Sequence, residues 1–352
     1  MRASSRAPHG LFRTLAFFAA TCAAACTSGS STPPAQPGPV GNPLGTCSGD
    51  AATCIHGTVA TRGFNVAFQS AKVDLFAVYP YGKSTPVAEA AVASGGNFAF
   101  SNVDAQGRYY LQAIAKFSGA AGDFAVASVV GPITLPATDS VDVKIRPVFL
   151  EALEQRPTGA ALALSWASAH VYDPGSAKEL TDAQVTLTAG AAPVDMPYGT
   201  NLSGQKSYFV QLPNGATAPT ALQIGVAHAT FPGGATFNLA ATAPDFDPQV
   251  SAPLDQTQIS VGQPLDVVWA QEPRAAYAIV ELFAGSAGSF DAKYASDAPR
   301  GPSVTKETIP GSAIAAPGAY LLNVQMSRPT CPATADGCVY NASTAAINLT
   351  AK

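Results

Sequence analysis

Short runs in which every second residue is apolar constrain the fold of this 352-residue chain more than any other feature. They recur from Ile55 onward, and Gly, Pro, Asn or Asp separates them, as around "ALALSWASAHVY", "DAQVTLTAG" and "ALQIGVAHATF". Because successive side chains of a strand point to opposite faces, this period of two predicts half-buried strands joined by turns. The sequence therefore predicts an all-β fold of antiparallel β-sandwiches.

A basic start and an uncharged apolar run over Leu15–Ala25 indicate an export signal. The run is shorter than the roughly 20 residues that a membrane-spanning helix needs. Residues 23–26 read AAAC, which resembles the lipobox of bacterial lipoproteins, although Ala23 stands where that family usually has leucine. The resemblance implies that the signal, residues 1–25, is removed and that Cys26 becomes the lipidated first residue. A secretory signal cut at the same place without lipidation is the alternative.

Residues 26–46 are rich in Ser, Pro and Gly and contain few large apolar side chains. Such a stretch cannot bury a core, so we expect a disordered, semi-stiff linker that separates a lipidated cysteine from the folded part. Thr27, rather than an acidic residue, follows Cys26. The resemblance to lipoproteins then implies an outer-membrane location, with the lipid bilayer as a partner.

Four further cysteines form two pairs of equal spacing, in CSGDAATC at 47–54 and CPATADGC at 331–338. An exported chain meets an oxidising compartment, where an even number of cysteines indicates disulfides. We therefore predict two local bridges, Cys47–Cys54 and Cys331–Cys338. Zinc is the alternative because His56 follows Cys54 closely, but zinc sites usually have tighter cysteine pairs with further ligands nearby.

The alternation divides into three stretches of domain size, 47–150, 157–244 and 248–352. In the first stretch we expect strands over Ile55–Thr61, Lys72–Tyr79, Asn97–Val103, Arg108–Lys116 and Val141–Phe149. Its motifs GTV (57–59), AKVDL (71–75), GNFAFSNV (96–103) and GRYYLQA (107–113) resemble the transthyretin-like sandwich of carboxypeptidase regulatory-like domains. This resemblance implies a fold and no activity.

The second stretch predicts another antiparallel sandwich, in which PNGAT (213–217) indicates an Asn-Gly hairpin. In the third stretch, ISVGQPLDVVW (259–269) and PGAYLLNV (317–324) resemble bacterial immunoglobulin-like or fibronectin type III-like domains. That resemblance implies a sandwich in which Tyr320 closes a corner by a hydrogen bond to the backbone. We therefore predict three β-sandwich domains in tandem.

The chain carries 23 acidic and 19 basic residues and no run of Lys and Arg. Nucleic-acid binding requires clustered cations and is therefore excluded as a function. The sequence contains no G-x-S-x-G, H-E-x-x-H or P-loop motif, and no G-x-G-x-x-G follows a predicted strand. We predict a non-enzymatic protein without a cofactor.

Two histidines and two acids remain candidates for a metal site. His170 and His228 fall in phase with the apolar residues of their strands and could face each other in the middle domain, as a metal-dependent site or a proton switch. The alternative is that each ends a core face and bonds to the backbone. Asp245 and Asp247, between the second and third domains, could join a calcium site, or they could belong to a solvated linker.

Four aromatic residues lie in or beside predicted loops of the first domain: Phe64, Phe68, Tyr79 and Tyr81. They could form an exposed binding patch, or they could cover the open end of that sandwich. Together with the anchor, these features predict a bacterial envelope lipoprotein with a binding or structural role and a protein or glycan partner. An enzyme built on the two histidines of the middle domain and a mere spacer in a larger assembly are the alternatives.

Overall fold

The computed structural model describes residues 39–80, 84–117, 124–137, 140–157, 163–189, 192–200, 206–217, 221–240, 246–286, 289–296 and 300–352. The predicted signal, Cys26 and most of the predicted linker lie outside these residues, as do Tyr81 and Asp245. The described residues form β-strands and two short 3-10 turns, η1 (Ala51–Thr53) and η2 (Gly311–Ala313), and no α-helix occurs among them. The predicted all-β fold with antiparallel sheets is confirmed.

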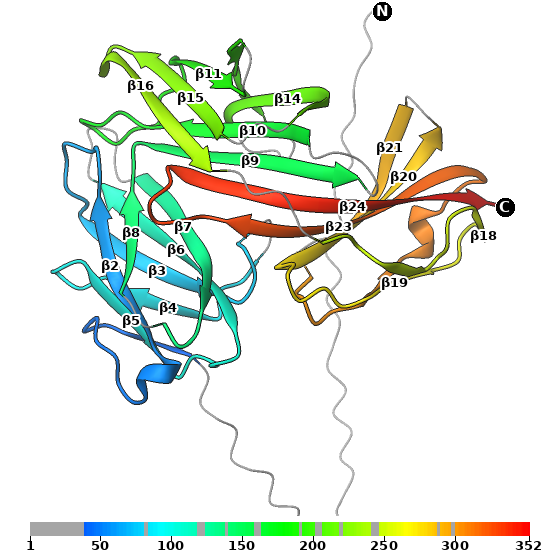
Figure 1. Ribbon diagram of the computed structural model, residues 1–352, viewed down its shortest axis with the longest axis horizontal. Coiled ribbons are helices and arrows are strands. Elements are labelled where there is room, and N and C mark those ends of the chain that lie inside the picture. Colours follow the sequence, from blue (N-terminus) through cyan, green and yellow to red (C-terminus); the bar gives the residue numbers. More distant parts are fainter. Residues whose placement is uncertain are drawn as a thin grey trace, which may run out of the picture. The chain divides into compact units, whose positions relative to one another are not determined.

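Two four-stranded sheets enclose the core of the first stretch (Figure 1). Their orders are β1-β5-β2-β8 and β4-β3-β6-β7. The strands are β1 (Val40–Asn42), β2 (Ile55–Thr61), β3 (Ser70–Phe76), β4 (Ala88–Ala91), β5 (Asn97–Ser101), β6 (Arg108–Phe117), β7 (Phe124–Thr134) and β8 (Val141–Ile145). Phe98 and Phe100 of one sheet and Leu111 of the other are fully buried between them, which is the sandwich that the alternation predicts.

Several strand boundaries in this part differ from the predicted ones, and two of the differences have a clear physical reason. β1 lies inside the predicted linker because its backbone pairs with β5, so the linker ends before residue 46. The predicted strand over Val141–Phe149 is split, because Pro147 has no N–H for a strand ladder. β8 therefore ends at Ile145, and β9 (Val148–Pro157) begins in a different sheet.

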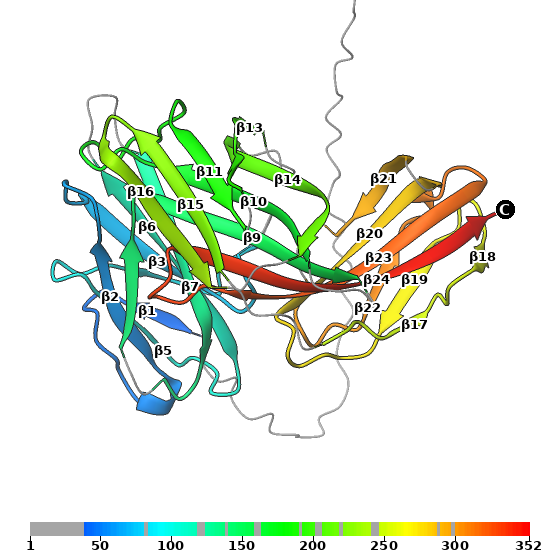
Figure 2. The same ribbon diagram turned by 45° about the horizontal axis from the view of Figure 1, so that its top comes forward.

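A nine-stranded sheet connects the second and third stretches through β24 (Figures 1 and 2). Its order is β13-β14-β10-β9-β24-β23-β20-β21, with β18 beside β24. Its remaining strands are β10 (Ala163–Val171), β13 (Tyr198–Thr200), β14 (Lys206–Thr217), β18 (Thr257–Ile259), β20 (Tyr277–Ser286), β21 (Ser289–Ala295), β23 (Gly318–Thr330) and β24 (Gly337–Ala351). The first half of β24 pairs in parallel with β9, and most of its length pairs antiparallel with β23.

Two smaller sheets pack against this large sheet. One contains β12 (Val194–Asp195), β11 (Gln184–Thr188), β15 (Ala221–His228) and β16 (Phe231–Ala240), and the other β17 (Val250–Ala252), β19 (Leu265–Trp269) and β22 (Lys306–Ile309). Val339 of β24 lies in the core of the middle sandwich, and Leu349 of the same strand lies in the core of the third. The division into three domains stays a prediction, and the structure adds that one strand serves two cores.

The predicted Asn-Gly hairpin is wrong. Residues 213–217 lie inside β14, whose register against β10 passes from Trp166↔Gln211 to Leu164↔Ala216. The residues between these two pairs are extra in the ladder, so the PNG sequence makes an irregularity within the strand. Pro213 favours this outcome because it cannot donate to a neighbouring strand. β14 and β15 also belong to different sheets, so no hairpin joins them.

Tyr320 has the role that the resemblance of the third stretch implies. Its side chain is buried, and its hydroxyl donates a hydrogen bond to the carbonyl of Ala316 at 2.9 Å. This bond closes the corner that leads into β23.

Candidate functional site

Both predicted disulfides are confirmed. Cys47 and Cys54 are bridged with their Cα atoms 6.0 Å apart, and Cys331 and Cys338 with theirs 4.3 Å apart. Two disulfides fit a protein that is exported to an oxidising compartment.

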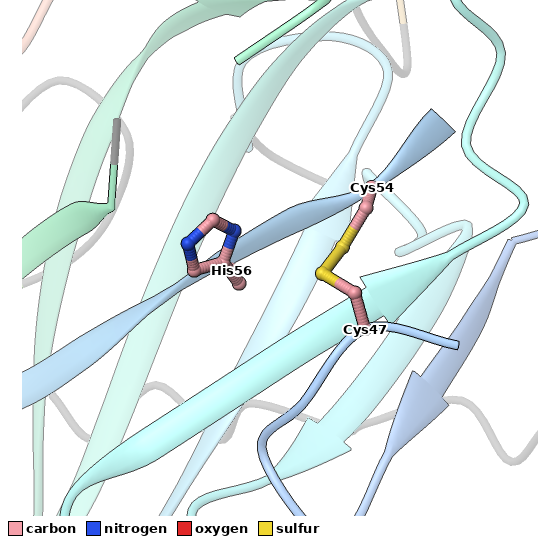
Figure 3. A group of neighbouring side chains, drawn as sticks. All are labelled: Cys47, Cys54 and His56. Carbon is pink, nitrogen blue, oxygen red and sulfur yellow. A yellow bond between two sulfur atoms is a disulfide. The ribbon is translucent and has the colours of Figure 1, made fainter. Parts of the chain in front are cut away.

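His56 lies beside the first disulfide, as Figure 3 shows. The ligand atoms of Cys47, Cys54 and His56 lie within 4.8 Å of one another. The two sulfur atoms are bonded to each other, whereas a zinc ligand is a thiolate. The structure therefore favours the disulfide over the zinc alternative at this place.

The second disulfide closes the loop between β23 and β24, and we call residues 331–338 the hairpin tip. Cys331 exchanges two backbone hydrogen bonds with Gly131 of β7, at 2.9 and 3.2 Å. Gly131 has a φ of 152°, which favours glycine, and a side chain there would overlap the ring of Tyr110. Glycine at this position thus leaves room for the ring of Tyr110 beside the backbone that bonds to the hairpin tip.

Polar side chains connect the hairpin tip to both of its neighbours. Arg146, which follows β8, donates from Nη2 to the carbonyl of Ala333 at 2.9 Å, and its Nε lies 3.3 Å from Asp336 Oδ1. On the other side, Asn238 of β16 donates its backbone N–H to Asp336 Oδ2 at 3.0 Å. The hairpin tip is thus bonded to the first and the middle sandwich at once.

A buried tyrosine pair joins the first and third stretches to β9 behind the hairpin tip. The hydroxyls of Tyr79 and Tyr340 both donate to Oε1 of Glu151, at 3.0 and 2.7 Å. Burial, and then the negative charge of Glu151, raises the pKa of each tyrosine well above its usual value. The hydroxyls therefore stay protonated and keep donating. Tyr110 adds a bond from its hydroxyl to the Pro329 carbonyl at 3.4 Å.

An open groove of about 540 Å³ lies beside the hairpin tip. Its walls come from the loop after β2, the segment after β8, the hairpin tip and β16. The side chains that give it chemical character are Arg62, Asn65, Arg146, Phe231, Phe237 and Asp336. A volume of this order is typical of sites that take small ligands.

The register of two parallel strands places two cations at the same end of the groove. β2 and β8 pair in parallel up to Thr61↔Ile145, so Arg62 and Arg146 leave the sheet side by side. Burial lowers the pKa of Arg146, the nearby charge of Arg62 lowers it further, and Asp336 opposes both effects. Arg62 is exposed, and no ion pair of its guanidinium is found among the described residues. One positive charge in the groove is therefore left without a carboxylate.

The predicted aromatic residues have other surroundings. Phe64 and Phe68 are half-buried and pack on the ring of Phe117, with ring centroids 5.0 and 6.5 Å away, which agrees with the alternative that they cover the end of the sandwich. Tyr79 is only 1% exposed, so it joins the interior rather than an exposed patch. Tyr81 lies outside the described residues.

The metal candidates contact different partners. Nδ1 of His170 lies 3.0 Å from Glu179, whereas Nδ1 of His228 lies 2.9 Å from the Thr230 hydroxyl. Asp247 accepts hydrogen bonds from Arg156 at 2.9 Å and from the Ser343 hydroxyl at 2.6 Å. These contacts attach Asp247 to β9 and β24 rather than leaving it in a solvated linker, and Asp245 is outside the described residues.

The groove was not predicted from the sequence, although the sequence contains one indication of it. The strands "TVAT" and "VKI" are each followed at once by an arginine. The two arginines become neighbours only because β2 and β8 pair in parallel, and nothing local in either strand shows that pairing. Asp336 and Phe237 were missed for the same reason, since the hairpin tip and β16 approach through tertiary contacts.

Comparison with known proteins found no matching family model and no curated protein of similar sequence. Among solved structures, the FN1–FN3 domains of chicken CNTN1 match with 9% identity over 83% of this chain and 91% of that one, at a TM-score of 0.22. A D1–D4 ectodomain fragment of ICAM-5 matches with 15% identity over 85% of this chain and 77% of that one, at a TM-score of 0.17. We therefore infer function from the chain's own residues.

The described residues contain no helix that is both long enough and apolar enough to span a membrane.

Proposed function

We propose that this protein is an exported, membrane-tethered binding protein that acts without catalysis. The observation that carries the proposal is the open groove, whose walls come from separate parts of the chain and meet at the hairpin tip. Loops and strand ends at the junction of sandwiches are a natural place for recognition, because a stiff scaffold positions them. The proposed partner is a protein of the cell envelope.

The contacts around the groove support a preformed site. The hairpin tip is held by a buried disulfide and by hydrogen bonds to Gly131 and Asn238. A site that is ordered before binding loses less conformational entropy when its partner arrives. The groove can therefore bind by side-chain contacts without first folding its own walls.

A photo-cross-linking experiment in cells tests this role. Asn65, which is exposed in the groove, is replaced by a photoreactive benzoylphenylalanine in the full-length chain. We expect one discrete cross-linked product after irradiation. The matched control places the same residue at Lys116, an exposed position of the first sandwich outside the groove, and should not give that product. Equal products, or none, at both positions would contradict a binding role for the groove.

We also propose that Cys26 carries the anchor, with the protein attached to the outer membrane by its acyl chains. The support comes from the AAAC motif and from the Pro- and Gly-rich stretch that follows it. The test is the intact mass of protein extracted from membranes with detergent, for the wild type and for Cys26→Ser. A wild-type chain that begins at Cys26 and carries lipid supports the anchor. A chain cut elsewhere and free of lipid would rule it out.

A further inference from the structure

We propose that the groove takes an extended acidic peptide segment, which adds as a strand to the open edge of β16 and places a carboxylate on Arg62. This inference rests on the proposed binding function and names the class of partner. It combines an unpaired strand edge, an uncompensated cation and two aromatic side chains, all of which line the same groove.

The edge of β16 supplies backbone hydrogen-bonding groups. β16 is the last strand of its sheet, in the order β12-β11-β15-β16. At Asn238 its outer side is already used, because Asn238 and Asp336 exchange bonds at 3.0 and 3.4 Å. In an antiparallel strand, alternate residues present their N–H and C=O to the same side. The backbone groups of Thr236 therefore face the same side as those of Asn238.

The open part of this edge is the part that lines the groove. Gly234, Thr236 and Phe237 belong to the groove wall. Apart from the bond at Asn238, no backbone hydrogen bond from β16 to a segment outside its own sheet is found among the described residues. An extended peptide could continue the pairing where the hairpin tip stops, as in strand addition to other exposed sheet edges.

The charges favour an acidic occupant. Of the described residues that line the groove, Arg62 and Arg146 are cationic and Asp336 is the one carboxylate, and that carboxylate contacts Arg146. A carboxylate at Arg62 would supply the missing counter-charge and would relieve the repulsion between the two arginines. Guanidinium groups bind carboxylates through paired hydrogen bonds, which gives direction as well as attraction.

The apolar part of the groove favours a peptide over a simple anion. Phe231 and Phe237 are half-buried and line the same wall as Thr236. An extended peptide presents alternate side chains to opposite faces, so it can set an apolar residue on these rings while a neighbouring carboxylate reaches Arg62. A small inorganic anion could use only the arginine.

A peptide-binding assay tests whether the groove requires an acidic occupant. A fluorescein-labelled octapeptide of alternating Val and Glu is titrated with the full mature chain, and fluorescence anisotropy reports binding. We expect this peptide to bind, and a Val/Gln version to bind at least about tenfold more weakly, since a hydrogen bond between charged groups is stronger than one to a neutral amide. Arg62→Ala should weaken binding of the Val/Glu peptide by a similar factor. Lys116→Ala removes the same charge from an exposed position outside the groove and should leave binding unchanged. Equal losses in both variants would overturn the inference.

The backbone requirement has its own test. Thr236→Pro removes one outward N–H of an edge strand, whereas Thr236→Ala keeps it. Only the proline variant should weaken peptide binding. If circular dichroism shows that the proline variant does not fold, the wild-type chain is assayed instead with two N-methylated Val/Glu peptides. One carries the methyl groups on its odd-numbered amides, and the other carries them on its even-numbered amides. One of the two peptides should bind poorly, because methylation blocks strand pairing on one side.

Competition separates the other occupants. Inorganic phosphate or an oligogalacturonate could displace the bound peptide, while Thr236→Pro and N-methylation of the peptide leave its affinity unchanged. This pair of results would mean that the groove recognises anions and not a strand. That result overturns the inference. A cross-linked partner at position 65 together with no binding of the Val/Glu peptide would also overturn it, while the proposed binding function would stand.

Discussion

Glu154 provides a direct test of the contact between β9 and β24. The side chain of Glu154 is fully buried. In the parallel register Glu154 lies opposite Asn341, which is 1% exposed. Among the residues that the structure describes, neither carboxylate oxygen of Glu154 and neither amide atom of Asn341 has a hydrogen-bond partner. A buried carboxyl without a partner is costly to ionise, and burial raises the pKa of Glu154 from 4.5 to about 7.

The direction of the pH effect follows from that shift. Between pH 4.5 and 7 the folded chain keeps a proton on Glu154 that the unfolded chain has lost. This group therefore lowers the free energy of unfolding as the pH rises through that range, and its effect is complete above pH 7. At about 1.4 kcal/mol per pKa unit, the full loss for a shift from 4.5 to about 7 is about 3.5 kcal/mol.

Glu154→Gln removes the ionisation while keeping the shape of the side chain. We expect the variant to be more stable than the wild type by up to about 3.5 kcal/mol at pH 8, and about equal to it near pH 4.5. Urea unfolding of both proteins at the two pH values, followed by tryptophan fluorescence, measures the difference. Taking the difference cancels the titration of groups that the two proteins share.

Glu89→Gln is the matched control. Glu89 lies on the surface, where it pairs with Lys72 at 3.2 Å, so its replacement should give no gain in stability at pH 8. A Glu154→Gln variant no more stable than the wild type at pH 8 would contradict a carboxyl group whose pKa is raised by burial. A gain of the same size at both pH values would contradict it equally.

Three further substitutions test other contacts of the fold by thermal unfolding. Tyr340→Phe removes one of the two hydrogen bonds to Glu151 and should cost about 1–3 kcal/mol, whereas no measurable change would exclude the tyrosine pair as a structural link. Gly337→Ala should strongly destabilise the fold, because its new methyl group would overlap the backbone of β9. Gly199→Ala, which has open space around it, should leave the stability unchanged. Equal effects of the two substitutions would contradict the tight β24–β9 pairing. Tyr320→Phe should cost about 1 kcal/mol through loss of the corner bond, and an unchanged midpoint would argue against that corner.

The predictable part of the fold was the part that is local in sequence. β2 has the predicted bounds, and β6 differs by one residue, because alternation and turn residues are read within a few positions. The two disulfides were predictable because the cysteines of each pair are only seven positions apart in the sequence. Tyr320 was predictable because the motif that carries it also contains its turn.

The unpredicted part depends on pairings between distant strands. Nothing in the sequence of β24 shows that its first half pairs in parallel with β9, so the shared sheet was missed. The same is true of β2 and β8, whose parallel register brings Arg62 beside Arg146. Tyr79 was a candidate for an exposed patch, and its burial could not be predicted because its hydrogen-bond acceptor Glu151 lies on a distant strand. Candidate site residues were therefore harder to find than strands.

Calorimetric unfolding of the mature chain tests the central claim that the hairpin tip and β24 unite the three stretches into one body that holds the groove. We predict one cooperative transition, because β9, β24 and β23 share a sheet and the hairpin tip is bonded to β7 and β16. Two or three well-separated transitions would contradict it. They would mean that the stretches unfold independently and that the walls of the groove are not held together.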